Sequence, residues 1–143
     1  MKFVKITTVL LSLIALLTGA MDVIVGVAGQ ANIGVGTAAV APFDPVLDSQ
    51  VRFLGAVWLG LGAIQLVCLG DLRRYGLILQ LCFAIVVLGG IGRALSLLQA
   101  GHPSSDIGTA FIAVALAIEL LLVPLAWLAF RRATLAADEG FVR

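Results

Sequence analysis

The sequence predicts an all-α integral membrane protein, a four-helix bundle with both termini in the cytoplasm. Three observations lead to this fold. First, 62% of the 143 residues are hydrophobic and 12% are charged, whereas a soluble domain carries roughly 25% charged residues. Second, four apolar runs are each long enough to cross a hydrocarbon core about 30 Å thick. Third, seven of the nine Lys and Arg residues fall on one side of these runs, which the positive-inside rule makes the cytoplasm.

The first predicted span covers residues 5–28. Lys2 and Lys5 precede its apolar centre, a pattern that also occurs in signal peptides, and small residues at 18–20 offer a cleavage site. The apolar run continues past Ala20, however, and this favours an uncleaved spanning helix.

The second and third spans follow a loop at 29–43. That loop is rich in glycine and β-branched residues, and its sequence fits either a short hairpin or a segment along the membrane surface. The second span is predicted at 45–69, because Asp44 can cap the free N–H groups and Pro45 suits the first helical turn. A polar break then leads to the third span at 75–99.

The fourth span is predicted at 107–130, after a turn in which Ser105 or Asp106 can cap the helix. A chain of this length suits one domain. We therefore expect a transmembrane domain over residues 1–132 and a polar cytoplasmic tail over 133–143.

Pro124 lies inside the fourth span, just over one turn past Glu119. Proline has no amide hydrogen, so it removes the helical bond to the carbonyl of Leu120, and we expect the helix to bend there. The freed carbonyl becomes an acceptor near Glu119, although a passive bend is the plainer interpretation.

Each predicted helix carries a stripe of small and polar residues at helical spacing. In lipid, small residues let helices approach closely and polar ones add hydrogen bonds, so these stripes predict packing faces. In chain order they are Thr8, Ser12, Ala15, Thr18, Gly19, Asp22, Gly26 and Gly29; Asp48, Arg52, Gly55, Trp58, Gly62 and Gln65; Gly89, Arg93, Ser96 and Ala100; and Gly108, Ile112, Ala115, Glu119 and Ala126.

Arg93 is the residue that packing alone explains least well. A charged side chain near the bilayer centre costs at least ~2.5 kcal/mol, and the helix of Arg93 offers no acid at i±3 or i±4. Counting about 1.5 Å per residue, we place Asp22 at the level of Arg93 and Glu119 near the midplane, within its reach. We expect Asp22 to be the main partner, and Arg52 near the outer surface to complete a cluster.

Two interpretations of the charge cluster Asp22, Arg52, Arg93, Ser96 and Glu119 stay open. The charges either form a static network that fixes helix order, or they line an outward-facing intramembrane pocket. In the second case we expect a non-enzymatic protein that binds a lipid or small amphiphile, or an accessory subunit. Alternatively, Glu119 could stay protonated and act as the titrating group of a small oligomeric proton-coupled transporter.

The sequence contains no motif of an enzyme, a metal site or a cofactor site. His102 is the only histidine, so it forms no metal site by itself, and an enzyme using His102 with Asp106 ranks last. Cys68 and Cys82 are interpreted as small core residues. The net charge of +1 and the scattered aromatics argue against a nucleic-acid partner. The partners that we expect are membrane lipids, further copies of the chain or a partner membrane protein.

The stretch at 92–104 resembles the signature of a family of small bacterial four-helix membrane proteins, the domain of unknown function 4345 (DUF4345) family. The resemblance implies a four-helix bundle in the bacterial inner (cytoplasmic) membrane, points to a relationship with the DoxX-like proteins, and supplies no activity. One departure is Ala100, which stands where the family has an aspartate. The matching residues are Gly92-Arg93, Ser96, Gly101-x-Pro103 and Glu119, together with Arg52, Gly55, Gly60 and Gly62.

Overall fold

The computed structural model describes residues 1–32 and 44–139, with residues 136–139 described by their backbone alone, and within these ranges every regular element is a helix. Four of the helices are long and apolar enough to cross a membrane. The prediction of an all-α fold is therefore confirmed, and the four predicted spans correspond to helices that could cross a membrane. The elements are α1 (Lys2–Val25), α2 (Val27–Asn32), α3 (Pro45–Gly70), α4 (Gly76–Ala100), α5 (Asp106–Ala117), the π-helical turn η2 (Ile118–Leu122) and α6 (Val123–Glu139).

The helix boundaries follow from residues with special backbone chemistry. Asp44 Oδ1 accepts a bond of 3.0 Å from the amide of Val46, with Pro45 next to it, so α3 begins at the predicted residue. Ser105 Oγ accepts a bond of 3.0 Å from Gly108 and caps α5. Gly26 has a φ of 64°, which ends α1 at Val25.

The last span is longer than the sequence predicted. α5, η2 and α6 follow one another without a break, and α6 continues to Glu139. Part of the polar tail expected at 133–143 is therefore helical. The two conformations considered for the loop at 29–43 concern mainly residues 33–43, which lie outside the described part of the chain.

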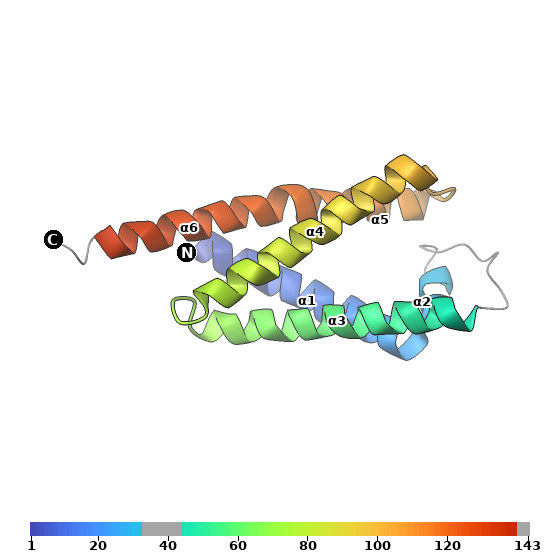
Figure 1. Cartoon of the computed structure of the whole chain (residues 1–143), viewed down its shortest axis with the longest axis horizontal. Helices are drawn as coiled ribbons and strands as arrows, with labels where there is room; N and C mark the ends of the chain where they lie inside the picture. The colour runs from blue at the N-terminus through green and yellow to red at the C-terminus, as the bar shows by residue number, and fades with distance from the viewer. Residues whose placement is uncertain (33–43, 140–143) are drawn as a thin grey trace.

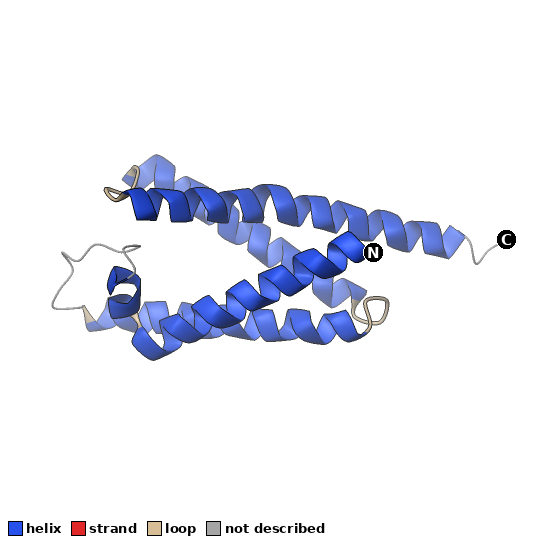
Figure 2. Cartoon of the chain, turned by 180° about the vertical axis from the view of Figure 1, so that it is seen from behind, coloured by secondary structure: helices blue, strands red, loops and turns tan. Residues whose placement is uncertain are grey.

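The four spans form two helix pairs that converge at one end of the molecule (Figure 1). α1 packs along α3, and α4 packs against η2 and α6. Met1, the turn between α3 and α4 and the C-terminal end of α6 lie at the convergent end, as Figures 1 and 2 both show. Toward the other end, where α5 begins and α2 lies, the two pairs diverge.

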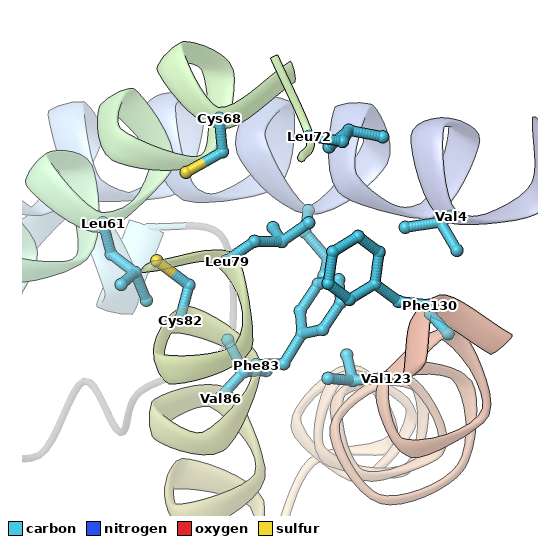
Figure 3. Close-up of a cluster of buried hydrophobic side chains, with 12 residues drawn as sticks. Val4, Leu61, Cys68, Leu72, Leu79, Cys82, Phe83, Val86, Val123 and Phe130 are labelled. Atoms are coloured by element: carbon cyan, nitrogen blue, oxygen red, sulfur yellow. The ribbon is translucent and has the colours of Figure 1, made fainter. Parts of the chain in front are cut away.

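The hydrophobic core lies where the two pairs converge (Figure 3). Phe83 of α4 and Phe130 of α6 are its largest members, with 0% and 1% exposure. Cys68 and Cys82 are buried free thiols in this core, which confirms their interpretation as small core residues. The other labelled members are Val4, Leu61, Leu72, Leu79, Val86 and Val123.

The predicted stripes on the first two spans are the interface between α1 and α3. A Cβ on Gly19 would lie 2.7 Å from the backbone oxygen of Gly55, so the two backbones touch. Polar side chains add bonds across the interface: Trp58 Nε1 donates to Thr18 Oγ1 at 3.0 Å. The sequence thus placed this packing face correctly, as expected for close helix approach in lipid.

The stripe predicted on the third span is only partly correct. Gly89, Ser96 and Ala100 are exposed, whereas Gly90 is buried against the last span. The buried side of α4 is set by its bulky core residues, Leu79, Phe83 and Val86. The burial of large apolar side chains therefore decided the rotation of α4 more than its small residues did.

Candidate intramembrane charge site

Arg93 and Glu119 form a two-pronged ion pair inside the spanning helices. Arg93 Nε donates to Glu119 Oε2 and Arg93 Nη2 donates to Glu119 Oε1, each at 3.1 Å. The side chain of Glu119 is 10% exposed and that of Arg93 is 34% exposed. The guanidinium also lies over the ring of Phe111 from α5, 5.7 Å from its centroid.

The backbone around the pair brings α4 and η2 unusually close together. Helical side chains lean toward the N-terminus of their helix, so Arg93 leans from its own level toward the middle of the bundle, where Glu119 lies. Gly90, one turn earlier on α4, leaves room for this contact. A Cβ there would lie 2.8 Å from Glu119 Cβ and from Leu120 Cδ2.

Glu119 sits in the π-helical turn η2, which ends two residues before Pro124. The amide of Val123 donates to the carbonyl of Ile118, five residues back. In this register the amide that Pro124 lacks would face the carbonyl of Glu119, not that of Leu120 as a regular α-helix predicts. The expected disturbance near Pro124 is therefore present, but as a wide turn that carries the carboxylate, and such turns are frequent at functional sites.

The predicted pairing of Asp22 with Arg93 is wrong. Asp22 Oδ1 accepts a bond of 3.1 Å from Gln30 Nε2, and a Cβ added to Gly55 would lie 2.5 Å from the Asp22 Cβ. Asp22 thus faces α3, and the helix pair that contains it diverges from the pair that carries Arg93 at this end.

Arg52 also lies outside the charge site that Arg93 and Glu119 form. Its Nε donates to Asp48 Oδ2 at 2.7 Å, and its Nη1 donates to the carbonyls of Val23 and Ile24 at 2.7 and 3.0 Å. Asp48 Oδ1 accepts from the amide of Val27 at 3.0 Å. This pair therefore binds the end of α1 and the start of α2, next to Gly26, as a helix cap.

The predicted five-residue cluster is consequently two separate groups. Arg93 and Glu119 join α4 to the last span, while Asp22 and Arg52 belong to the α1–α3 pair, and Ser96 is exposed on α4. Sequence reasoning missed Phe111, although it lies at i−8 from Glu119 and so faces the same way within a quarter turn. In the described ranges, 1–32 and 44–139, no three His, Cys, Asp or Glu side chains gather as a metal site would require.

The family model described as domain of unknown function (DUF4345) matches residues 3–130. The chain belongs to the DUF4345 family. The matched DUF4345 region contains Arg93, Glu119, Gly90 and Phe111, and thus the whole ion-pair site. The same comparisons find no match to this DUF4345 protein among curated proteins or solved structures. The relationship to the DoxX-like proteins and the bacterial source stay predictions.

Proposed function

We propose that this chain is a non-enzymatic membrane protein that binds the polar head of a lipid or other small amphiphile at the Arg93–Glu119 pair. One observation carries the proposal. Arg93 uses Nε and Nη2 to hold Glu119, and no residue in the described part of the chain accepts a bond from its Nη1. A guanidinium donor that is partly exposed at membrane depth needs an acceptor, and a phosphate or carbonyl oxygen of an amphiphile suits it.

Glu119 has a positioning role in this proposal. Its two carboxylate oxygens hold the guanidinium in one orientation, and Phe111 lies against one face of the guanidinium. The pair is neutral overall, so the site favours hydrogen bonding to a head group over the capture of a free ion. The same exposed donor would serve a carbonyl or carboxylate of a partner membrane protein, which is the accessory-subunit form of the proposal, or of a second copy of the chain.

The alternative of a proton-coupled transporter that uses Glu119 is less favoured. Both oxygens of Glu119 accept from Arg93, so binding a proton would break a two-pronged ion pair. Vesicles containing the protein should therefore show no proton flux that depends on Glu119, and a flux that disappears in Glu119→Gln would favour the transporter.

Native mass spectrometry of gently solubilised protein tests the head-group proposal. Wild type should retain a lipid or small amphiphile, and Arg93→Gln should reduce the retained fraction at least tenfold. Arg52→Gln is the matched control, because it removes an arginine that is bonded to Asp48 and to the carbonyls of α1. It should leave the retained fraction unchanged.

A second variant keeps this test meaningful if Arg93→Gln folds poorly. Glu119→Gln keeps one acceptor oxygen for the guanidinium and removes the negative charge that competes with an anionic head group, so retention of an anionic amphiphile should stay equal or increase. The proposal fails if wild type retains nothing, or if the Arg93 and Arg52 variants lose ligand equally.

We further propose that the chain lies in a bacterial inner membrane with both termini in the cytoplasm, and the charge distribution supports this orientation. Exposed basic residues gather at the convergent end of the bundle, while the Arg93 site lies toward the opposite, divergent end. Thiol labelling tests this orientation in a background with Cys68→Ala and Cys82→Ala. An impermeant reagent should label Ser104→Cys in intact cells and leave Gly70→Cys unlabelled, whereas the reverse pattern would invert the topology. The basic residues at that end are Lys2, Lys5, Arg73, Arg74, Arg131 and Arg132.

A further inference from the structure

An apolar groove runs between α3 and α4 at the convergent end of the molecule, whereas the Arg93 site lies toward the divergent end. Its volume is about 410 Å³. Its α3 wall begins at the exposed Ala63 and runs toward the end of that helix, and its other wall is the start of α4. The lining residues are Ala63, Ile64, Val67, Cys68, Tyr75 and Ile78.

Two arginines lie in the turn next to this groove. Arg73 and Arg74 are exposed in the turn between α3 and α4, and the guanidinium of Arg74 lies over the ring of Tyr75, 5.4 Å from its centroid. Asp71 Oδ1 accepts from the backbone amides of both arginines, at 3.1 and 3.0 Å. The carboxylate of Asp71 therefore orders the backbone of the turn, and both guanidinium groups stay exposed. Asp71, Arg73 and Arg74 together give the turn a net charge of +1.

We infer that this groove is a binding site for an anionic phospholipid. One acyl chain lies against the apolar lining, and the phosphate faces Arg73, Arg74 and the phenol of Tyr75. Lipid chains fill any apolar groove on a surface that faces the membrane. The positive charge of the arginines beside this groove then favours lipids with an anionic head group. Basic pockets between spanning helices bind anionic head groups in this way, and tyrosine favours the head-group level.

The dimensions of the groove agree with this occupant. Ala63 lies seven residues before the end of α3 at Gly70, which corresponds to a depth of about 10 Å. That depth holds the upper part of an acyl chain while the phosphate stays level with the turn. An apolar partner helix fits less well, because it would have to pass the two exposed arginines.

Lipid titration of the full chain, followed by native mass spectrometry, tests the inference. Phosphatidylglycerol is the probe, and phosphatidylcholine with the same acyl chains is the lipid control. Each basic residue near a membrane surface strengthens binding of anionic lipid roughly fivefold. The variant with Arg73→Gln and Arg74→Gln should therefore bind phosphatidylglycerol about thirtyfold more weakly, and wild type should bind phosphatidylcholine at least tenfold more weakly than phosphatidylglycerol.

Two matched controls separate a built site from general attraction to a charged surface. Arg131→Gln with Arg132→Gln removes the same charge from the same end of the protein and should weaken binding less than threefold. Ala63→Phe fills the groove and should weaken binding roughly tenfold, because about ten close atom contacts between the acyl chain and the lining are lost. Ala56→Phe, at an exposed position of α3 outside the groove, should have no effect.

The result that overturns the inference is equal weakening by the two arginine pairs, because that result indicates surface attraction only. Unchanged binding in Ala63→Phe also overturns it, since the acyl chain then lies elsewhere. Arg93→Gln should leave this affinity unchanged, so the outcome is independent of the head-group proposal for the Arg93 site. The side chains substituted at positions 56, 63, 73, 74, 131 and 132 are exposed, and those variants should unfold at the wild-type temperature.

Discussion

At the scale of single residues, the ion pair between Arg93 and Glu119 is the most consequential contact of this protein. Glu119 is nearly buried, and a buried carboxylate that loses its partner keeps the cost of leaving water. Arg93 is partly exposed, so its own cost is smaller. Removing Arg93 should therefore destabilise the fold more than removing Glu119 does. It should also destabilise the fold more than removing both groups, because no unpaired charge is then left.

A double-mutant cycle tests this coupling by thermal unfolding in detergent. Arg93→Leu should lower the free energy of unfolding by about 3 kcal/mol, because it leaves Glu119 unpaired. The double change with Glu119→Leu should restore part of that loss. The matched control combines Arg93→Leu with Asp22→Leu, and these effects should add within about 0.5 kcal/mol. Coupling at Asp22 and additivity at Glu119 would refute this assignment of the pair.

Adjacent glycines on α4 provide a second test at the residue scale. A methyl group on Gly90 would lie 2.8 Å from Glu119 Cβ, whereas nothing lies within 4 Å of a Cβ on Gly89. Gly90→Ala should therefore destabilise the protein by about 1–3 kcal/mol and weaken the coupling between Arg93 and Glu119. Gly89→Ala should be neutral or stabilise the helix by up to about 1 kcal/mol. Equal unfolding temperatures for the two variants would contradict the close approach of α4 and η2.

At the scale of elements, the strongest association is between α1 and α3. Their small residues allow backbone contact, and hydrogen bonds from Ser12 to Gln65 (3.4 Å) and from Trp58 to Thr18 (3.0 Å) cross the interface. In lipid, close packing and such bonds are the main forces that hold helices together. α4, by contrast, contacts the last span through its core residues at one end and through the ion pair further along.

Glycine substitutions on α3 test this interface. A Cβ on Gly55 would lie 2.5 Å from Asp22 Cβ, so Gly55→Ala should separate the helices and lower the free energy of unfolding by about 1–3 kcal/mol. Gly60 lies on the same helix with nothing within 4 Å, so Gly60→Ala should leave the unfolding temperature nearly unchanged. Similar losses in both variants would contradict this close contact, because alanine has a higher helix propensity than glycine and propensity alone gives no loss.

At the scale of the whole molecule, stability is concentrated at one end. The core lies where the helix pairs converge, around Phe83 and Phe130, while the other end is held by pairwise contacts (Figures 1 and 3). We therefore expect that the helix pairs can move relative to one another at the divergent end without loss of the core. This supports the placement of the proposed head-group site at that end.

A pair of phenylalanine substitutions measures this asymmetry. Phe83→Ala removes a fully buried ring and should cost about 3–5 kcal/mol. Phe111 is 41% exposed and contacts the guanidinium of Arg93, so Phe111→Ala should cost only about 1 kcal/mol. Thermal unfolding of the two variants provides the measurement, and comparable losses would show that the divergent end contributes as much as the core.

The sequence by itself determined the four spans, their approximate ends and the face by which α1 meets α3. Length and apolar content decide whether a helix can span a membrane. A stripe of glycine, serine and threonine predicts the face on which two membrane helices pack closely. The helix caps at Asp44 and Ser105 were also among the positions that the sequence predicted, because each capping bond joins residues close together in the chain.

Only the tertiary structure decided which acid pairs with Arg93. Counting residues along a helix gives the depth of a side chain in the membrane, and depth favoured Asp22. It leaves open the rotation of each helix and the divergence of the two helix pairs, both of which depend on contacts distant in sequence. Large core side chains such as Phe83 set the rotation of α4, and the wide turn before Pro124 carries Glu119. Together they turned Arg93 toward Glu119, because packing around the bundle, and not depth alone, determines which charges meet.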